Sequence, residues 1–412
     1  MSRPLPDEGR PWGDLEAEMS AMRDGDLDWR KGRHGAYVWY ADDELEEVLA
    51  RAFSMFMVEN ALGIRVFQSI RRMETEVLDT VAGLLHAPEG SAGVFTSGGT
   101  ESIFLAVHGM REWAKASRPA LERPTVVAPH SAHPALNKAA HYLGMEVVRV
   151  PVGPDHRADP AALEGALTQD TIGLYVSAPS YTLGLVDPVP AVSAIAKRHN
   201  LWLHVDACVG GILAPAVREA GFEVPSFDFM NEGVSSISAD LHKSGFAAKP
   251  ASTVTFRSTE LREFTRYRFD DWPSGTYTSY TFPGSRPGGA IAAAWAAFQF
   301  LGREGYRRIA ESSMRARSLI EEGVLQIPGV RVHGEPELWA FAFGADDVDH
   351  RKVAGLMASH GWISGPTTSP PGIHVMATPV HEAHATEFVE EVASCFAAVR
   401  EGEGVAREAA YN

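Results

Sequence analysis

Cysteine is almost absent from this chain, which has only Cys208 and Cys395 among its 412 residues. Two cysteines cannot build a disulfide framework or a cysteine-rich zinc site, and they favour a reducing, cytoplasmic location. The chain also lacks the run of about 18 apolar residues that a membrane-spanning helix requires. Its first residues include prolines and acidic side chains where a secretory signal would be apolar. We therefore expect neither membrane insertion nor secretion.

Positive charge is in deficit: Lys and Arg number 37 against 53 Asp and Glu, which gives a net charge of −16. A nucleic-acid-binding protein would need a basic face, and the basic clusters here are short fragments such as Arg71-Arg72. We therefore expect no nucleic-acid partner. A small anion held at a local site remains compatible with this charge.

Between residues 93 and 257, short apolar runs alternate with helical patterns. The runs are rich in Val and Ile and show little polar alternation, which is typical of a parallel sheet covered by helices on both faces. The pattern therefore predicts a large α/β domain. The predicted strands span residues 93–97, 125–129, 146–152, 171–178, 201–207, 235–240 and 252–257.

The segments on either side of these strands predict an arm and a second domain. The polar N-terminal residues are typical of an arm with one short helix. Helical periodicity runs over 44–62 and 66–86, and again over a long helix at 290–324 that is interrupted near Gly302. The pattern strand–strand–helix–strand–helix then predicts a small α+β unit. The expected division is an N-terminal arm at 1–50, a large domain at 51–300 and a small domain at 301–412.

The segment Ser97-Gly98-Gly99-Thr100 lies between a predicted strand and a predicted helix. Its glycines let the backbone turn tightly, and the free N–H groups and dipole of the following helix attract an anion. A capped helix after a glycine-containing turn is nevertheless common without any ligand. Alone, this motif does not predict a function.

Three further residues follow predicted strands. Asp206 ends an apolar strand at the edge where α/β sheets bind ligands, although a helix cap would explain it equally well. Lys243 follows another strand, where a lysine in an apolar site could form an imine with an aldehyde. His133 follows a third strand and could lie over a ring, although on its own it would be assigned as a helix cap.

Taken together, these motifs meet the requirements of pyridoxal 5'-phosphate. A phosphate site, an acid that keeps a ring nitrogen protonated and a lysine for the aldehyde occur in the chain in that order. The assignment places the phosphate at Gly99 and Thr100, the ring nitrogen at Asp206 and the aldehyde at Lys243. Pyridoxal 5'-phosphate is thus the expected cofactor, and a small amine the expected substrate.

Six longer stretches carry a family resemblance: TSGGTESI (96–103), SAHPALNKAAHYLGMEVVRVP (131–151), GLVDPVP (184–190), LHVDACVGG (203–211), SISADLHKSGFAAK (236–249) and GSRPGG (284–289). Through them the chain resembles the sphingosine-1-phosphate lyase branch of the group II pyridoxal-phosphate decarboxylases, from about Gly35 to about His381. The resemblance implies fold type I, an aspartate aminotransferase-like α/β fold with a seven-stranded sheet. It also implies a homodimer whose active sites are shared between the subunits.

The resemblance also implies site residues by position. In such enzymes the GSRPGG turn comes from the neighbouring subunit and completes the phosphate site. The candidate catalytic residues are Lys243, His133, Asp206 and Tyr277. The candidate cofactor-binding residues are Ser97, Gly98, Gly99, Thr100, His133, Asp206, His242, Lys243, Gly284 and Ser285. The candidate substrate-binding residues are Tyr37, Asn60 and Lys249, with Trp39 and Tyr40 as alternatives to Tyr37.

Substrate-facing positions depart from the family pattern. Gly63, Leu183 and Ser244 stand where the lyases place two histidines and a tyrosine. Cofactor residues are retained while substrate-facing residues differ. We therefore expect a pyridoxal-phosphate-dependent carbon–carbon lyase that acts on a different, smaller amine than a sphingoid phosphate.

Two other functions remain open at this point. An amino-acid α-decarboxylase would use the same cofactor residues, and the sequence does not show which bond at the α-carbon breaks. The aldehyde lyase is favoured because SISADLHKSGFAAK and GSRPGG resemble that branch most closely. A cofactor-binding scaffold without catalysis is opposed by the intact Lys243, Asp206 and His133.

Two further groups of residues do not predict a site. His381 and His384 have the spacing of metal ligands, but no cysteine lies near them in the sequence, and we expect no metal. An aromatic cluster after residue 270 could stack a nucleic-acid base, but the net charge favours loop packing at a dimer interface. This cluster comprises Trp272, Tyr277, Tyr280 and Phe282.

Overall fold

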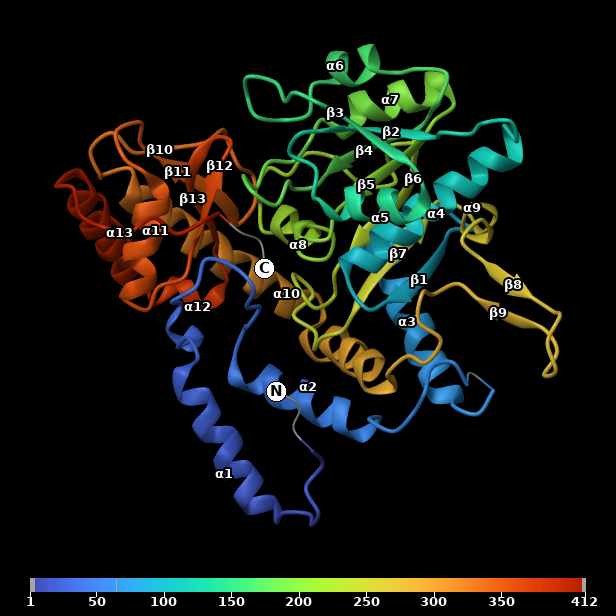
Figure 1. Ribbon diagram of the computed structural model, residues 1–412, viewed down its shortest axis with the longest axis horizontal. Helices are drawn as coiled ribbons and strands as arrows, with labels where there is room; N and C mark the ends of the chain where they lie inside the picture. The colour runs from blue at the N-terminus through green and yellow to red at the C-terminus, as the bar shows by residue number, and fades with distance from the viewer. Residues whose placement is uncertain (1–3, 64, 410–412) are drawn as a thin grey trace.

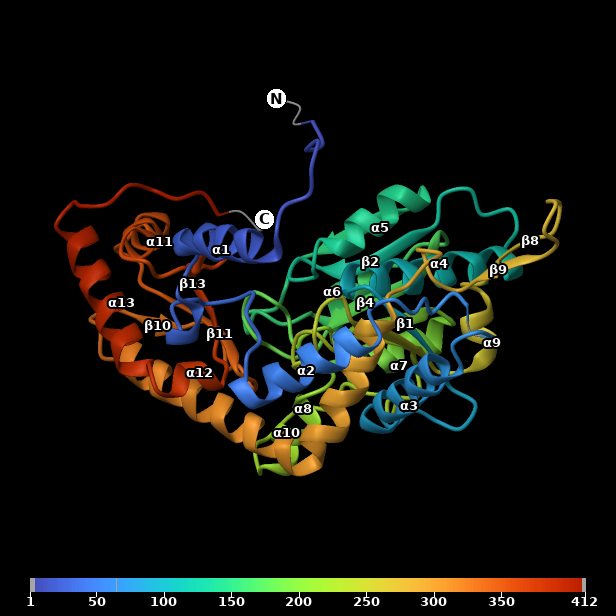
Figure 2. The same ribbon diagram turned by 90° about the horizontal axis from the view of Figure 1, so that it is seen from below.

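The computed structural model describes residues 4–63 and 65–409. Within these ranges the strands form a seven-stranded sheet, a four-stranded sheet and a two-stranded hairpin. The two larger sheets lie in separate halves of the molecule, as Figure 1 shows. Helix α10 (Gly288–Val324) runs along the molecule from one half to the other (Figure 2).

The seven strands predicted from the sequence form the large sheet, in the order β1-β7-β6-β5-β4-β2-β3. The sheet is mixed and not purely parallel, because β7 runs antiparallel to both of its neighbours, β1 and β6. A loop without a crossover helix joins β6 to β7, whereas parallel neighbours are usually joined through a helix. The strands are β1 (Ala92–Thr96), β2 (Thr125–Pro129), β3 (Glu146–Val150), β4 (Thr171–Ser177), β5 (Trp202–Asp206), β6 (Val234–Ala239) and β7 (Ser252–Phe256).

Helices cover this sheet, and its five inner strands are almost wholly buried between them, whereas the edge strands β1 and β3 are partly exposed. Leu174, Val205 and Ile237 have no exposed surface and belong to the same apolar core. A sheet with both faces covered explains why the strands show continuous apolar runs and little alternation. The helices that follow strands β1 to β5 are α4 (Gly99–Ser117), α5 (Ala135–Leu143), α6 (Pro160–Gly165), α7 (Val189–His199) and α8 (Ala214–Glu219).

The helix predicted over 44–62 is too long. Helix α2 (Asp43–Met55) begins at the Asp42 cap and ends before the periodic pattern does. The chain then turns to pair with a distant segment, because the Ala61 N–H donates to the Arg286 carbonyl at 2.9 Å. Tertiary pairing therefore overrides local helical periodicity here, and the next helix, α3 (Gln68–Leu84), starts after this contact.

The four-stranded sheet has the order β10-β11-β13-β12 and packs on the last helices. The predicted interruption of the long helix is confirmed: Gly302 has φ 54° within α10. Strand β12 was not predicted, since Pro366 lies in it; β12 occupies the sheet edge, where proline is tolerated. These elements are β10 (Arg331–Val332), β11 (Ala340–Gly344), α11 (His350–Ser359), β12 (Gly365–Thr368), β13 (Pro371–Met376), α12 (Pro379–Glu382) and α13 (Ala385–Arg400).

The predicted boundary between the large and the small domain, at residue 300, falls inside α10 and stays a prediction.

Two exposed elements project from this body (Figure 1). Helix α1 (Trp12–Met22) has no buried residue, which fits the predicted arm. The hairpin of β8 (Tyr267–Phe269) and β9 (Tyr277–Ser279) was not predicted, because each strand has only three residues. Short elements complete the chain: η1 (Arg23–Gly25), η2 (Trp29–Lys31) and α9 (Thr259–Glu263).

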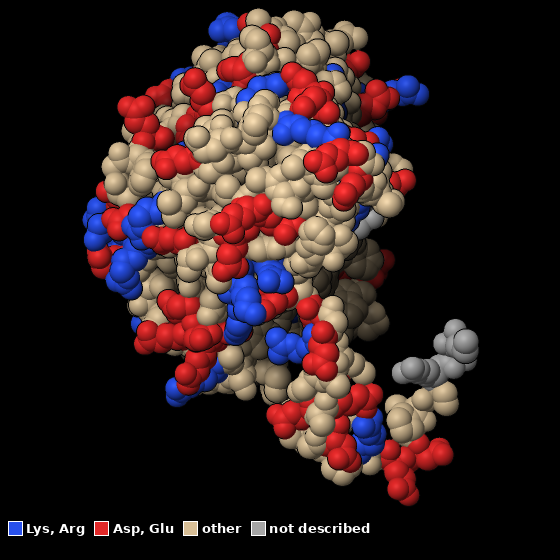
Figure 3. All heavy atoms as spheres, turned by 90° about the vertical axis from the view of Figure 1, so that its left-hand side faces the viewer, with Lys and Arg blue, Asp and Glu red and all other residues tan. Residues whose placement is uncertain are grey.

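The surface and the cysteines show no unexpected feature. Acidic and basic side chains alternate over the face in Figure 3, and the basic ones there form small separate groups. That face offers no continuous basic surface for a nucleic acid. Cys208 and Cys395 are both buried and free. Along the described part of the chain, no helix is both long and apolar enough to cross a lipid bilayer.

Candidate active site

A cavity of about 360 Å³ opens at the carboxyl ends of strands β1, β2, β4, β5 and β6. This edge is where open α/β sheets bind ligands. Its lining includes eight residues that the sequence predicted as cofactor contacts. They are Ser97, Gly98, Gly99, Thr100, His133, Asp206, His242 and Lys243.

The glycine turn brings backbone close to this cavity. Helix α4 begins at Gly99, so the N–H groups of its first turn lie at the cavity wall. A Cβ at Gly99 would lie 2.7 Å from Cys208 Sγ and 2.9 Å from Asp240 Oδ2, so no other residue fits without a shift. The cavity thus has the glycine-lined helix N-terminus that a phosphate group requires.

Ser97 is already engaged by the protein. Its N–H and its Oγ both donate to Glu101 Oε2, each at 2.7 Å. The other oxygen of Glu101 accepts a hydrogen bond from the Phe282 N–H at 2.9 Å. Glu101 therefore ties the glycine turn to the loop that carries the predicted Tyr277 and Ser285.

Asp206 is 7% exposed and has a hydrogen bond at each carboxylate oxygen. Tyr175 donates to Oδ2 at 2.5 Å, and the Cys208 N–H donates to Oδ1 at 3.1 Å. Burial alone would raise the pKa of Asp206, but His133 and these hydrogen bonds outweigh it, so its pKa lies below the ordinary value. The carboxylate is therefore available as the anionic partner of a protonated ring nitrogen.

His133 lies at the cavity wall after β2. Burial lowers the pKa of His133, and its Nδ1 accepts a hydrogen bond from the Ala135 N–H at 3.2 Å. Its ring meets that of Tyr181 edge-on at 6.1 Å. The Asp206 carboxylate opposes this shift in the pKa of His133, and the aromatic ring lies at the cavity wall, where it could lie against a conjugated ring.

Lys243 Nζ lies 2.9 Å from Asp240 Oδ2, and Asp240 is 1% exposed. Lys249 does not line the cavity, but burial of its amine and the charge of Lys243 lower the pKa of Lys249. The two lysines therefore interact electrostatically, with Lys243 at the cavity and Lys249 beside it.

The other predicted residues do not line this cavity. Asn60 Nδ2 donates to Ser285 Oγ at 3.0 Å, and a Cβ at Gly284 would lie 3.7 Å from the Tyr277 hydroxyl. These four residues form a second group outside the cavity. Tyr37 lies on the N-terminal arm, 53% exposed, with φ 73°.

Three cavity or near-cavity residues were missed by the sequence analysis: Tyr175, Glu101 and Asp240. Asp240 ends an apolar strand, as Asp206 does, and the same reasoning would have found it. Tyr175 stands in the apolar run of β4, and a buried phenol needs a partner, which is a usable signal. Its partner could not be named, because the pairing of β4 with β5 is visible only in the sheet.

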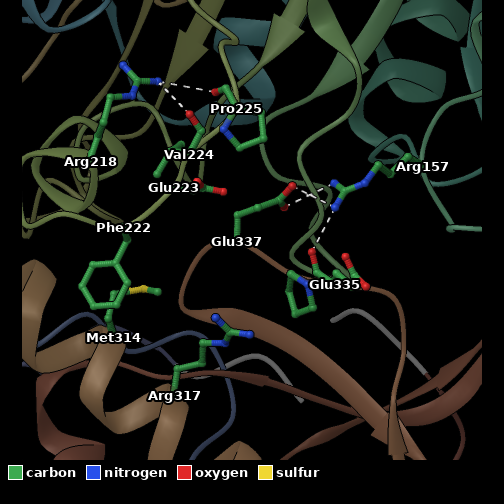
Figure 4. A pocket seen from close by; sticks show the side chains of 11 residues that line it. Arg157, Arg218, Phe222, Glu223, Val224, Pro225, Met314, Arg317, Glu335 and Glu337 are labelled. Carbon is green, nitrogen blue, oxygen red and sulfur yellow. Dashed lines mark hydrogen bonds and ion pairs between the residues drawn. The ribbon is translucent and has the colours of Figure 1, made fainter.

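A second cavity, of about 820 Å³, lies between the loop after α8, the loop before β11 and helix α10 (Figure 4). No predicted site residue lines it. Its charged groups are largely neutralised within the protein, since Arg157 lies 2.8 Å from Glu337 and Arg317 lies 2.7 Å from Glu321. Size alone therefore does not make it the active site.

Comparisons with known proteins agree with the chemistry of the smaller cavity. Residues 48–345 match the pyridoxal-dependent decarboxylase conserved domain. The chain is 37% identical to the sphingosine-1-phosphate lyase of Oryza sativa, over 91% of this chain and 71% of that protein. It is 31% identical to a probable L-aspartate decarboxylase of Pyrococcus furiosus, over 87% of this chain and 94% of that protein.

Solved structures give the same fold. The sphingosine-1-phosphate lyase of Burkholderia pseudomallei superposes with a TM-score of 0.93 at 34% identity, covering 98% of this chain and 94% of that one. The glutamate decarboxylase of Lactobacillus brevis superposes with a TM-score of 0.83 at 20% identity, covering 98% and 96%. The second likeness supports the fold alone.

Proposed function

The chain belongs to the pyridoxal-dependent decarboxylase family, and we propose from this premise that it cleaves the Cα–Cβ bond of a β-hydroxy amine. Membership confirms the fold type I architecture, the pyridoxal 5'-phosphate cofactor and the lyase or decarboxylase class predicted from the sequence. The observation that supports pyridoxal-phosphate chemistry at this site is the convergence of Lys243, Asp206 and His133 on one cavity with the glycine turn. The choice of bond rests on the relatives.

The residues present fit the cofactor. When bound, pyridoxal phosphate supplies an electron sink for the pair released at the substrate α-carbon. Gly99 and Thr100 would hold its phosphate at the N-terminus of α4, and Lys243 would hold its aldehyde carbon. Asp206 would keep the ring nitrogen protonated, and His133 would lie against the ring.

Asp240 and Lys243 form the proton-handling pair of this site. The carboxylate of Asp240 orients the Lys243 amine at 2.9 Å and holds a proton at Nζ. Ser252 Oγ donates to the other oxygen of Asp240 at 2.5 Å, which fixes the carboxylate. Lys243 therefore lines the cavity with its amine paired to a fixed carboxylate.

The relatives support the choice of bond. The sphingosine-1-phosphate lyase of Oryza sativa is 37% identical to this chain, whereas the probable L-aspartate decarboxylase of Pyrococcus furiosus is 31% identical. An α-decarboxylase is the second candidate, because that decarboxylase is matched over 94% of its length. Both reactions use the cofactor contacts named above.

For the substrate, we keep the smaller amine as the proposal. Ser244 is fully buried, and Leu183 packs with Leu185 and Ala342, so neither lines the cavity. Gly63 adds no side chain. None of these three positions thus offers the cavity a polar group for a phosphorylated amino alcohol.

A homodimer with shared sites is also part of the proposal. Large apolar side chains are exposed in two places. Val58, after α2, is 87% exposed, and Phe282, in the 279–283 loop, is 75% exposed. Exposed apolar surface of this kind favours burial against a partner. Ser285 does not line the cavity of its own chain. It is therefore free to contribute to the cavity of a partner subunit, as the proposal requires.

The experiment is a screen of amines for spectral shifts of the bound cofactor, followed by assays for aldehyde and carbon dioxide release. We expect aldehyde from a small β-hydroxy amine, and slow or no cleavage of long-chain sphingoid phosphates. Carbon dioxide release from an amino acid would support the decarboxylase instead. Efficient cleavage of sphingosine phosphate at micromolar concentration would overturn the smaller substrate.

A further inference from the structure

Tyr175 is a fully buried residue of β4 whose hydroxyl points to the active-site edge of the sheet. It donates to Asp206 Oδ2 at 2.5 Å, the shortest of the hydrogen bonds that this carboxylate receives from Tyr175, Cys208 and Ser238. The bond from the Cys208 N–H is 3.1 Å and that from Ser238 Oγ is 3.3 Å. The phenol is therefore the principal donor to Asp206.

The phenol remains a donor over the accessible pH range. Burial and the charge of Asp206 raise the pKa of Tyr175 well above its ordinary value, so the hydroxyl keeps its proton. Its ring lies 5.3 Å from that of His204, the neighbour across the strand pair, which holds the ring in place. Tyr175 thus supplies a fixed, neutral donor to the carboxylate from the neighbouring strand β4.

We propose that Tyr175 is the positioning residue for Asp206: its hydrogen bond fixes the carboxylate and keeps it ionised for the ring nitrogen of the cofactor. This inference rests on the proposed role of Asp206. The groups that face the carboxylate are Tyr175 from β4, His204 from β5, Cys208 after β5, Ser238 from β6 and His133 after β2.

Removal of the phenol changes the balance at Asp206. Burial is then opposed by the remaining hydrogen bonds from Cys208 and Ser238 and by the nearby His133. The pKa of Asp206 therefore rises, and the carboxylate takes up a proton more readily. A protonated carboxyl must lose that proton before it can pair with a protonated ring nitrogen, which weakens cofactor binding. The loss of cofactor affinity is larger at low pH, where a larger fraction of the carboxyl is protonated, and it shrinks as the pH rises.

The test measures the dissociation constant of pyridoxal 5'-phosphate by absorbance, on full-length protein from which bound cofactor has been removed. Tyr175→Phe should raise this constant about tenfold at pH 7, because the carboxylate loses its principal donor, and by more at pH 5. Tyr280→Phe removes a similar phenol-to-carboxylate bond, 2.6 Å to Glu263, and serves as the matched control. An unchanged constant in Tyr175→Phe, with normal binding by the wild type, would overturn this inference alone; a wild type that binds no cofactor would overturn the proposed function as well.

A double-mutant cycle separates action through Asp206 from a structural effect. In an Asp206→Ala background, Tyr175→Phe should leave the dissociation constant within twofold, a limit of about 0.4 kcal/mol. If Tyr175→Phe alone does not fold, the melting temperature of Asp206→Ala is compared with that of the double variant. The double variant should melt at the same or a higher temperature, because the phenol has lost its acceptor; a lower melting temperature would show that the hydroxyl acts elsewhere.

Discussion

Lys243 Nζ and Asp240 Oδ2 lie 2.9 Å apart, and both residues follow the same strand, β6. Asp240 is 1% exposed, whereas Lys243 reaches the cavity. The lysine that would bind the cofactor aldehyde is thus oriented by a carboxylate that belongs to the protein core. Asp240 lies within hydrogen-bonding distance of this amine, so it holds the proton at Nζ and stabilises the charged form of the lysine.

This pair leads to the first prediction. Purified protein should absorb visible light through its bound cofactor, and borohydride should abolish the band by fixing the cofactor to Lys243. Peptide mapping after reduction measures the site of attachment, with Lys138→Ala on the exposed face of α5 as the control. A pyridoxyl group on Lys249 or Lys138 instead would contradict the assignment.

The second prediction concerns Asp206. Asp206→Ala should lower kcat by at least about a hundredfold, the scale for an electrostatic group that acts at developing charge. The covalent attachment at Lys243 should persist, because that bond does not involve the ring nitrogen. Steady-state kinetics beside the visible spectrum measure both effects, and near wild-type turnover would make Asp206 a structural residue.

The third prediction tests shared active sites. Lys243→Ala and Ser285→Trp should each be inactive as homodimers, the second because a bulky side chain fills the proposed partner site. Mixing the two after mild dissociation should restore part of the activity, since one site of each hybrid dimer has neither change. Absence of recovery, or a monomer in sedimentation at micromolar concentration, would refute the arrangement.

The fourth prediction concerns acid stability. Burial lowers the pKa of His374 to about 4 and of His204 to about 4, from 6.5. Both stay neutral in the folded protein while the unfolded chain takes up protons, so their stability contribution is present above pH 6.5 and lost as pH falls towards 4. Each group adds a slope of about 1.4 kcal/mol per pH unit in this window.

Denaturant unfolding at several pH values measures this slope. His374→Asn should reduce the pH dependence of the unfolding free energy by the share of one histidine, about 1.4 kcal/mol per pH unit. The asparagine keeps a donor for the Thr182 carbonyl, which His374 Nδ1 contacts at 2.9 Å. The control is His141→Asn on the exposed surface of α5, which reports the general effect of removing an imidazole. An unchanged slope in His374→Asn would mean that the protein has another source of acid sensitivity.

The fifth prediction is a gain of function at Gly63. A Cβ at Gly63 would meet no atom closer than 3.5 Å, so the first atom of a side chain fits there without a shift. Gly63→His introduces the imidazole that the resemblance to the lyases places at this position, and we expect it to improve kcat/KM on a phosphorylated amino alcohol about tenfold, the value of one charge-assisted hydrogen bond. Gly63→Phe is the control for bulk; an equal gain in both variants would contradict a polar role.

The large domain could be predicted from sequence because its signals are local. Each of the seven strands is a short apolar run, and the run needs no partner to be recognised. The antiparallel direction of β7 and the early end of α2 depend instead on what the chain meets in space. Ala61 pairs with Arg286, far away in the sequence, and no local pattern encodes that contact.

The same distinction applies to the site. Gly99, Asp206 and Lys243 lie at strand ends, where one topological rule brings them to a common edge, and all three line the cavity. Tyr175 lies inside a strand, so its contact with Asp206 follows from strand order and side-chain direction. Sequence patterns thus predicted the residues at the cavity better than the residues that support them.

Glu101 places an evolutionary constraint on two loops. One of its carboxylate oxygens accepts hydrogen bonds from Ser97, and the other accepts one from the Phe282 N–H. The two loops therefore share one carboxylate. A substitution at residue 101 leaves donors without a partner in both segments at once. Related chains that lack a carboxylate here should therefore carry compensating changes in both the glycine turn and the 279–283 loop, inherited together.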